Sequence, residues 1–295
     1  MASEPLVSIL TPSFNQARWL VDTLQSVARQ TYPHIEHIVM DGGSTDGSVD
    51  LLTQAGARVI WKSESDRGQS HALNKALGES TGEIIGWINS DDAYYDVDAV
   101  AAVVQCFARH PDVDVVYGHA ALVNADGHIL QMLWAAPFHY GLLRLHDFIV
   151  QPSVFFRRSA LGPTLVDETY HYAMDYELWL RLGRDHRFAK LNRIVGIDRN
   201  YPGRKSVTLT DDAWAEMAKL RAIYGATDFS PPMAVRAWKR AIKIAIRLMG
   251  TTLVSKASGP LAFDGSHDGI GRLALRQVAV SRARMMAKER PLEAS

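Results

Sequence analysis

The stretch Gly82-Glu83-Ile84-Ile85-Gly86-Trp87-Ile88-Asn89-Ser90-Asp91-Asp92 decides both the expected fold and the expected site. Its apolar run is too short for a globular helix and is rich in β-branched and aromatic residues, which favours a buried strand. Open α/β sheets bind ligands at the carboxyl ends of their strands, and hard oxygen donors of this kind suit Mg²⁺ or Mn²⁺. The alternative is that residues 89–92 only turn the chain and cap the next helix.

Before this stretch, short apolar runs alternate with helical patterns. We expect strands at residues 6–10, 35–40 and 58–62, with Pro12 opening the first loop. Such alternation predicts parallel strands joined by right-handed crossovers. Polar groups that follow successive parallel strands should therefore converge at one sheet edge.

After residue 92 the simple repeat ends. We expect a helix at 98–108, a strand at 113–117, a type I′ hairpin around Asp126-Gly127, a helix at 174–184, a strand at 187–197 and a helix at 210–224. The predicted fold is α/β, with a mixed, mostly parallel Rossmann-like sheet flanked by helices. We divide the chain into a domain at 1–228, with halves at 1–118 and 119–228, and a helical C-terminal extension at 229–295.

The composition is that of a globular enzyme, since 47% of residues are hydrophobic and 22% are charged. Cys106 is the single cysteine, which excludes an internal disulfide and a cysteine-based zinc site. The sequence shows no signal-peptide pattern and no apolar run of about eighteen residues. We expect a cytoplasmic protein, with or without peripheral attachment to the inner face of the plasma membrane.

The net charge of zero hides an asymmetry along the chain. Residues 231–295 carry twelve Lys or Arg against four Asp or Glu, a net charge of +8, which leaves −8 for residues 1–230. Within residues 234–250, basic side chains share one helical face and apolar side chains another. This pattern is typical of a helix that lies on an anionic membrane surface, and a helix that packs against a domain is the alternative. We expect no nucleic-acid partner.

Four motifs in order resemble the family 2 inverting glycosyltransferases, which have the nucleotide-diphospho-sugar-binding fold called GT-A. They are the residues 7–15, 40–47, 89–92 and 174–178, and the resemblance covers roughly residues 6–210. It implies a nucleotide diphosphate sugar as donor. A UDP-sugar is favoured, and GDP- and dTDP-sugars are alternatives.

The resemblance also implies roles for individual residues. Phe14 corresponds to the aromatic residue near the nucleotide base, Asp41 to the carboxylate that binds the base, and Asp66 to the next loop of the nucleotide site. The predicted donor-binding residues are Thr11, Phe14, Asp41, Asp66, Arg67, Gln69, Asn89, Ser90, Arg199 and Arg204, the last two as cations for the diphosphate.

Residues 89–91 occupy the position of the family's motif of two acidic residues around a variable one, but the first acid is replaced by an amide. We expect Asn89 to contact ribose, Asp91 to be the main ligand of Mg²⁺ or Mn²⁺, and Asp92 to assist or orient it. Asp175 corresponds to the general base, which takes the proton from the acceptor hydroxyl. Gln151 and Trp179 are predicted on the acceptor side.

The predicted function is an inverting, metal-dependent, hexosyltransferase-like glycosyltransferase acting on a glycan or lipid-linked acceptor in cell-envelope polysaccharide or glycolipid synthesis. Two alternatives remain at this point. A nucleotidyltransferase shares the sheet and the metal site, but it requires a Gly-rich phosphate-binding loop with Arg or Lys directly after the first strand. Residues 11–14 lack such a loop. A non-catalytic nucleotide-sugar-binding protein is consistent with Asn89.

Overall fold

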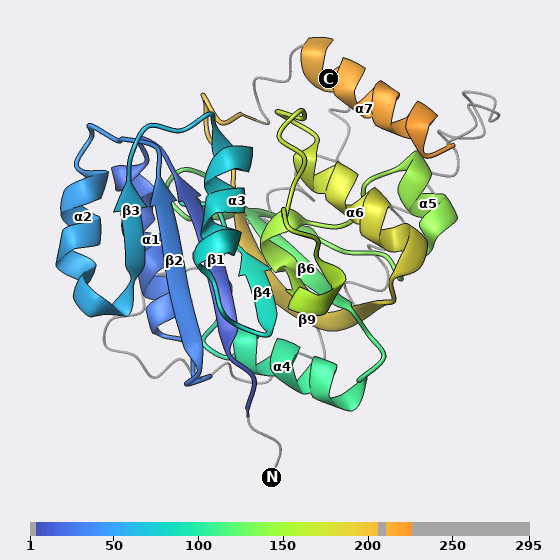
Figure 1. The fold of residues 1–295 in the computed structure, drawn as a ribbon, viewed down its shortest axis with the longest axis horizontal. Coiled ribbons are helices and arrows are strands. Elements are labelled where there is room, and N and C mark those ends of the chain that lie inside the picture. The colour runs from blue at the N-terminus through green and yellow to red at the C-terminus, as the bar shows by residue number, and fades with distance from the viewer. Residues whose placement is uncertain (1–3, 206–210, 226–295) are drawn as a thin grey trace, which may run out of the picture.

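The computed structural model describes residues 4–205 and 211–225. Within them one nine-stranded mixed sheet runs through the molecule, with helices on both of its faces (Figure 1). The strand order is β3-β2-β1-β4-β8-β6-β9-β5, and β7 pairs with β6 beside this path. The expected α/β class is confirmed.

The first part of the chain alternates strands and helices. Its elements are β1 (Val7–Ser13), α1 (Ala17–Ala28), β2 (Ile35–Asp41), α2 (Ser48–Ala55), the 3₁₀ turn η1 (Gly56–Arg58), β3 (Ile60–Ser63), α3 (Gln69–Glu79) and β4 (Ile84–Trp87). The four strands are mutually parallel. Their carboxyl ends therefore open on one edge, as the alternation predicts.

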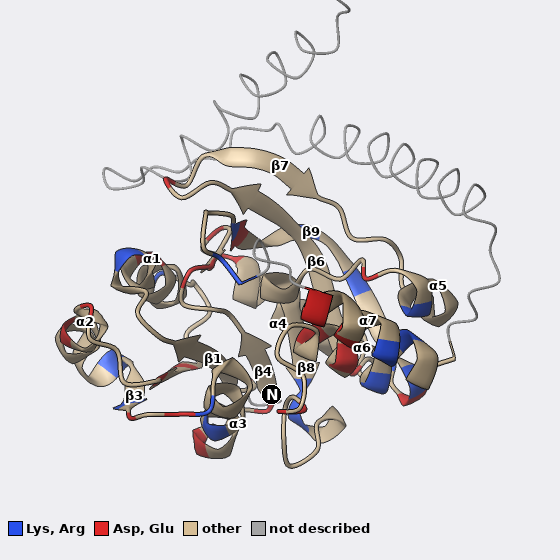
Figure 2. Ribbon diagram, turned by 90° about the horizontal axis from the view of Figure 1, so that it is seen from above, with Lys and Arg blue, Asp and Glu red and all other residues tan. Residues whose placement is uncertain are grey.

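The second part departs from this repeat. Its elements are β5 (Ala93–Tyr94), α4 (Ala99–Arg109), β6 (Val115–Val123), β7 (Ile129–Leu133), α5 (Tyr140–Leu145), η2 (Gln151–Ser153), β8 (Val154–Arg157), η3 (Arg158–Ala160), α6 (Met174–Asp185), β9 (Phe188–Arg199) and α7 (Asp211–Ile223). β8 is antiparallel to both of its neighbours, β4 and β6. Seen from above, α6 and α7 lie side by side, and β7 lies at the periphery (Figure 2).

Alternate residues of the central strands supply two cores. Leu10, Ile85 and Phe156 point into a core shared with α3 and α6. Their chain neighbours Ile9, Ile84 and Phe155 point into a core shared with α1 and α4. This period of two on a sheet covered on both faces explains why the strands read as continuous apolar runs.

Three sequence expectations differ from the structure. β1 continues through Pro12, whose nitrogen faces the β4 side, where pairing ends at Leu10 and Trp87, so no ladder bond is lost. The hairpin turn is not type I′, because Gly127 has a positive φ but Asp126 does not. The expected boundary at 118/119 falls inside β6, so the two halves share one sheet.

The expected C-terminal extension at 229–295, including the basic helix at 234–250, lies outside the described residues. Among the residues that are described, we find no helix long and apolar enough to cross a membrane.

Candidate functional site

The ends of β1, β2 and β3 bring three predicted donor-site residues together. A Cβ atom placed on Gly42 would lie 3.0 Å from Oδ2 of Asp66 and 3.2 Å from the exposed ring of Phe14. Gly42 follows Asp41 at the end of β2. Phe14, Asp41 and Asp66, predicted as one nucleotide-binding group, therefore converge at the same sheet edge.

Asp41 organises the loop that follows it. Its buried carboxylate accepts hydrogen bonds from the backbone N–H of Gly43 (3.1 Å) and of Ser44 (2.8 Å), and from the hydroxyls of Ser44 (2.5 Å) and Ser63 (2.6 Å). Three of these bonds are to Oδ2 and one is to Oδ1. Any contact with a base would therefore use Oδ1, which has room for a second donor.

Asp66 and Arg67 shape the next loop. Oδ1 of Asp66 accepts from the backbone N–H of Gly68 (2.7 Å), which leads into α3. Arg67 donates to Glu168 (2.7 Å) in the loop before α6, so this side chain links two sides of the site. Its pairing is exposed and contributes little to stability.

Asn89 stands at the centre of an amide network. Its Oδ1 accepts from Nε1 of Trp87 (2.9 Å) and Nε2 of Gln69 (2.8 Å). Its Nδ2 donates to Oδ2 of Asp92 (3.2 Å) and Oε1 of Gln151 (2.9 Å). All four hydrogen bonds of the amide are therefore made. Asn89 braces this loop, and the predicted ribose contact would require one of these bonds to break.

Asp91 is held by a ring of hydrogen bonds that includes Tyr201, a residue not identified from the sequence. The hydroxyl of Tyr201 donates to Oδ2 of Asp91 (2.8 Å) and accepts from Nε2 of Gln16 (2.9 Å). The buried Ser90 hydroxyl donates to Oε1 of the same glutamine. The ring of Tyr201 lies 4.0 Å from that of Trp19. These contacts fix the orientation of the Asp91 carboxylate.

Asp92 is buried behind Asp91. Its Oδ1 accepts from the backbone N–H of Arg199 (3.0 Å) and its Oδ2 from Asn89. Burial, with the nearby Asp91 and Asp198 carboxylates, raises the pKa of Asp92 well above its usual range. Both oxygens of Asp92 already accept a hydrogen bond inside the fold, and a direct metal contact of Asp92 stays a prediction. Its predicted orienting position agrees with this geometry.

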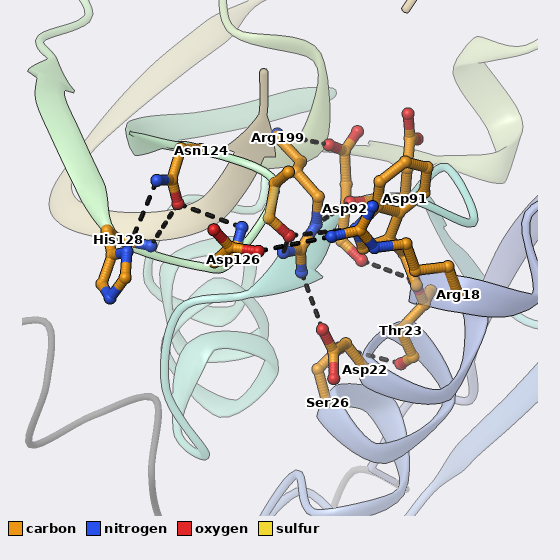
Figure 3. Close-up of polar contacts among 12 residues, drawn as sticks. Arg18, Asp22, Thr23, Ser26, Asp91, Asp92, Asn124, Asp126, His128 and Arg199 are labelled. Atoms are coloured by element: carbon orange, nitrogen blue, oxygen red, sulfur yellow. Dashed lines mark hydrogen bonds and ion pairs between the residues drawn. The ribbon is translucent and has the colours of Figure 1, made fainter. Parts of the chain in front are cut away.

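The two predicted diphosphate cations differ in their surroundings. Arg199 is buried and donates to the backbone oxygens of Asp91 (2.9 Å) and Ala125 (3.2 Å) and to Oδ2 of Asp22 (2.8 Å) (Figure 3). These contacts brace three chain segments, and a diphosphate contact of Arg199 stays a prediction. Arg204 pairs with Asp198, and the surrounding carboxylates raise its pKa despite burial.

The residues present fit a divalent cation that arrives with a diphosphate. No group of three His, Cys, Asp or Glu residues in the described part of the chain could hold a metal by itself. Oδ1 of Asp91 makes no hydrogen bond to the described residues, and Oδ2 is held by Tyr201. Mg²⁺ and similar ions are commonly held by one or two carboxylates, waters and substrate phosphates. Asp91 can supply one such ligand.

Asp175 lies in the first turn of α6, with Oδ1 accepting from the backbone N–H of Tyr176 (2.7 Å). Burial raises its pKa, and the charges of Lys205 and Arg204 partly offset this. A second buried carboxylate, Asp147, interacts electrostatically with Asp175. Burial and the charge of Asp175 raise the pKa of Asp147 well above its usual range. Asp147 was missed because residues 134–172 have no regular sequence pattern.

The predicted acceptor residues are placed differently from the expectation. Trp179 is fully buried and stacks on Phe156 in the core, with ring centroids 5.7 Å apart, so the acceptor prediction for it is wrong. Gln151 donates to the backbone oxygen of Trp87 (2.8 Å) and belongs to the amide network. The hydroxyl of Thr11, predicted in the donor site, is buried 2.9 Å from Nε2 of His37.

Comparisons of the sequence identify relatives. The profile of the family described as Glycosyl transferase family 2 matches residues 8–164, more than half of the chain. The chain is 30% identical over 162 residues to a PGL/p-HBAD biosynthesis glycosyltransferase of Mycobacterium tuberculosis, covering 54% of this chain and 61% of that relative. It is 25% identical over 235 residues to an uncharacterized glycosyltransferase of Rickettsia prowazekii, covering 73% and 72%. The chain thus spans less than two thirds of the mycobacterial relative.

Solved structures share the fold. TarS of S. aureus, in complex with UDP-GlcNAc, superposes with a TM-score of 0.58 at 17% identity, covering 78% of this chain and 69% of TarS. A mannosyltransferase from Pyrobaculum calidifontis, in complex with GDP-Man and Mn²⁺, gives 0.51 at 19% identity, covering 86% and 85%. Both similarities support the GT-A type of fold.

Proposed function

Because the chain belongs to glycosyl transferase family 2, we propose that it transfers a sugar from a nucleoside diphosphate donor to an acceptor hydroxyl, with inversion at the anomeric carbon. One observation carries the proposal. Arg204 interacts electrostatically both with Asp91 at the end of β4 and with Asp175 on α6. A single cation thus interacts with both the predicted metal ligand and the predicted base, and such a cation would oppose the charge of a leaving diphosphate.

In the proposed reaction, Asp175 accepts the proton of the acceptor hydroxyl as that oxygen attacks the anomeric carbon from the side opposite the diphosphate. Burial favours this role because it raises the pKa of the carboxyl and makes it a stronger base. Arg204, and Lys205 beside it, oppose the negative charge that develops on the leaving group. Asp91 would hold Mg²⁺ or Mn²⁺, which when bound neutralises diphosphate charge.

The relatives support a donor and an acceptor class. One similar structure holds UDP-GlcNAc and the other GDP-Man, which supports a nucleotide-sugar donor; a UDP-sugar stays the favoured prediction, with GDP- and dTDP-sugars as alternatives. The mycobacterial relative is named for PGL/p-HBAD biosynthesis, which supports a glycan or lipid-linked acceptor of the cell envelope. The basic segment 234–250 would bring the enzyme to an anionic membrane surface that carries such an acceptor.

The test is a panel of UDP-, GDP- and dTDP-sugars with Mn²⁺, read by thermal shift and by slow donor hydrolysis. We expect one donor class to raise the melting temperature and to be hydrolysed. Asp175→Asn should keep the thermal shift and lose turnover, whereas Asp185→Asn, at the exposed far end of α6, should keep both. No response to any donor would refute the function, and full turnover by Asp175→Asn would refute the base.

A further inference from the structure

The helix that carries Asp175 begins without a cap of its own. The residue at the N-cap position of α6 is Ala173, which has no side-chain oxygen, and no side chain of that residue caps the helix. The first N–H groups of a helix have no partner within the helix, so a buried start needs an acceptor from elsewhere. Within the first turn the N–H of Tyr176 is bound by Asp175 itself, so the N-cap end of the helix is the part that depends on other residues.

Glu216, on α7, binds the chain at the N-cap position of α6 and at the two residues before it. One carboxylate oxygen accepts from the backbone N–H of His171 (2.8 Å), and the other accepts from the N–H groups of Tyr172 (2.8 Å) and Ala173 (3.0 Å). These bonds lower the pKa of the carboxyl against the effect of burial, so it is charged at neutral pH. A charged acceptor makes stronger hydrogen bonds than a neutral one and suits the positive end of a helix.

The remainder of α6 is anchored by contacts that do not involve Glu216. The Tyr176 hydroxyl donates to the backbone oxygens of Leu143 (2.7 Å) and Arg144 (3.0 Å), and Trp179 is packed in the core. Asp175 lies between this fixed part and the segment held by Glu216. Loss of Glu216 should therefore release the turn containing Asp175 without unfolding the helix behind it.

Lys205 lies near the same junction. Its ammonium group is 5.5 Å from the centre of the Tyr172 ring, and it interacts electrostatically with both Asp175 and Glu216. Tyr172 is one of the residues whose N–H binds Glu216. The segment before α6 and Lys205 therefore both interact with Glu216, and Lys205 also interacts with Asp175.

We propose that Glu216 is a positioning residue for the transfer reaction: from α7 it holds the N-cap residue of α6 and the two residues before it, and so keeps Asp175 in place to take the acceptor proton. This proposal rests on the proposed function, in which Asp175 is the base. It adds α7, which lies beyond the residues matched by the family profile, to the machinery of the site.

The test compares Glu216→Ala, Glu216→Gln and the wild-type full chain in acceptor transfer with the donor identified by the panel. For Glu216→Ala we expect kcat to fall about 10- to 100-fold, because a misplaced catalytic group costs this much, while the donor KM changes less than about threefold. Glu216→Gln retains one oxygen acceptor and should recover part of the loss. Hydrogen exchange at the amides of 171–173 should accelerate in Glu216→Ala.

The matched control is Ala218→Gly, at an exposed position of α7, which weakens the helix by about 1 kcal/mol without removing a contact. We expect its kcat to match the wild type. Equal losses of kcat in Ala218→Gly and Glu216→Ala, or an unchanged kcat in Glu216→Ala, would overturn the positioning role. Absence of wild-type transfer with every donor, or full activity of Asp175→Asn, would instead refute the proposed function.

Discussion

Replacement of Asn89 by aspartate tests whether the amide network is assigned correctly. The substitution creates the usual acidic residue of the family motif and changes neither size nor shape. Its second oxygen would face Oδ2 of Asp92, now 3.2 Å from the amide nitrogen, and Oε1 of Gln151, now 2.9 Å from it. Two donated hydrogen bonds become two contacts between acceptors.

A lost hydrogen bond that leaves a buried acceptor unpaired costs about 1–3 kcal/mol. Because Asn89 is half-buried, we take the lower part of this range for each contact and expect Asn89→Asp to lower the free energy of unfolding by about 2–4 kcal/mol. In a domain of this size that corresponds to a fall in melting temperature of roughly 5–15 °C. Thermal and urea unfolding, followed by circular dichroism at pH 7.5, measure the change.

Asn124→Asp is the matched control. The Oδ1 atom of Asn124 accepts from the backbone N–H groups of Asp126 (3.1 Å) and His128 (2.8 Å), which a carboxylate also does, and its Nδ2 lies 3.4 Å from Nδ1 of His128, which as the N–H tautomer can donate to a carboxylate instead. We expect its stability to change by less than about 0.5 kcal/mol. Equal losses in the two variants, or an Asn89→Asp protein as stable as the wild type, would refute the assigned direction of the hydrogen bonds.

Three further predictions concern single side chains. Burial raises the pKa of Asp175, and the base must be ionised to accept a proton. The increase of kcat with pH should therefore occur at a pH above the ordinary aspartate pKa of about 3.9, which a pH–rate profile measures. Tyr201→Phe keeps the stacking on Trp19 but removes the donor to Asp91, and it should weaken Mn²⁺ binding in the presence of nucleoside diphosphate about 10-fold by calorimetry. Burial lowers the pKa of His37 to about 3 from 6.5. As pH falls from 6.5 towards 3, His37 becomes protonated in the unfolded chain but not in the folded protein. The free energy of unfolding should therefore decrease by about 1.4 kcal/mol per pH unit in this range, and His37→Gln should remove this slope.

The strand ends of the first half could be predicted because they depend on local pattern. Apolar runs with polar ends at Asp41 and Asp91 required only the alternation of strands and helices to bring them to one edge. The position of Asp175 in the first turn of α6 was likewise carried by a local helical pattern.

Tertiary partners account for what the sequence did not reveal. Trp179 resembles a surface aromatic in a helix with charged residues, but its side chain meets Phe156 of β8, a strand whose place in the sheet has no local signal. The guanidinium of Arg199 forms an ion pair with Asp22, which is far away in the chain. Glu216 binds backbone N–H groups, which leave no trace in side-chain spacing.

The antiparallel strand β8 also governs the order in which the molecule can assemble. β8 lies between β4 and β6 and pairs with both. These two strands therefore lack their shared pairing partner until residues 154–157 have been synthesised. Pairing over such sequence separations is slow and leaves strand edges exposed to other chains. A fragment that ends near residue 118, inside β6, would carry β4 without its neighbour β8. Such a fragment should aggregate during expression, whereas one that ends after α7 contains all the strands seen in residues 4–205 and 211–225.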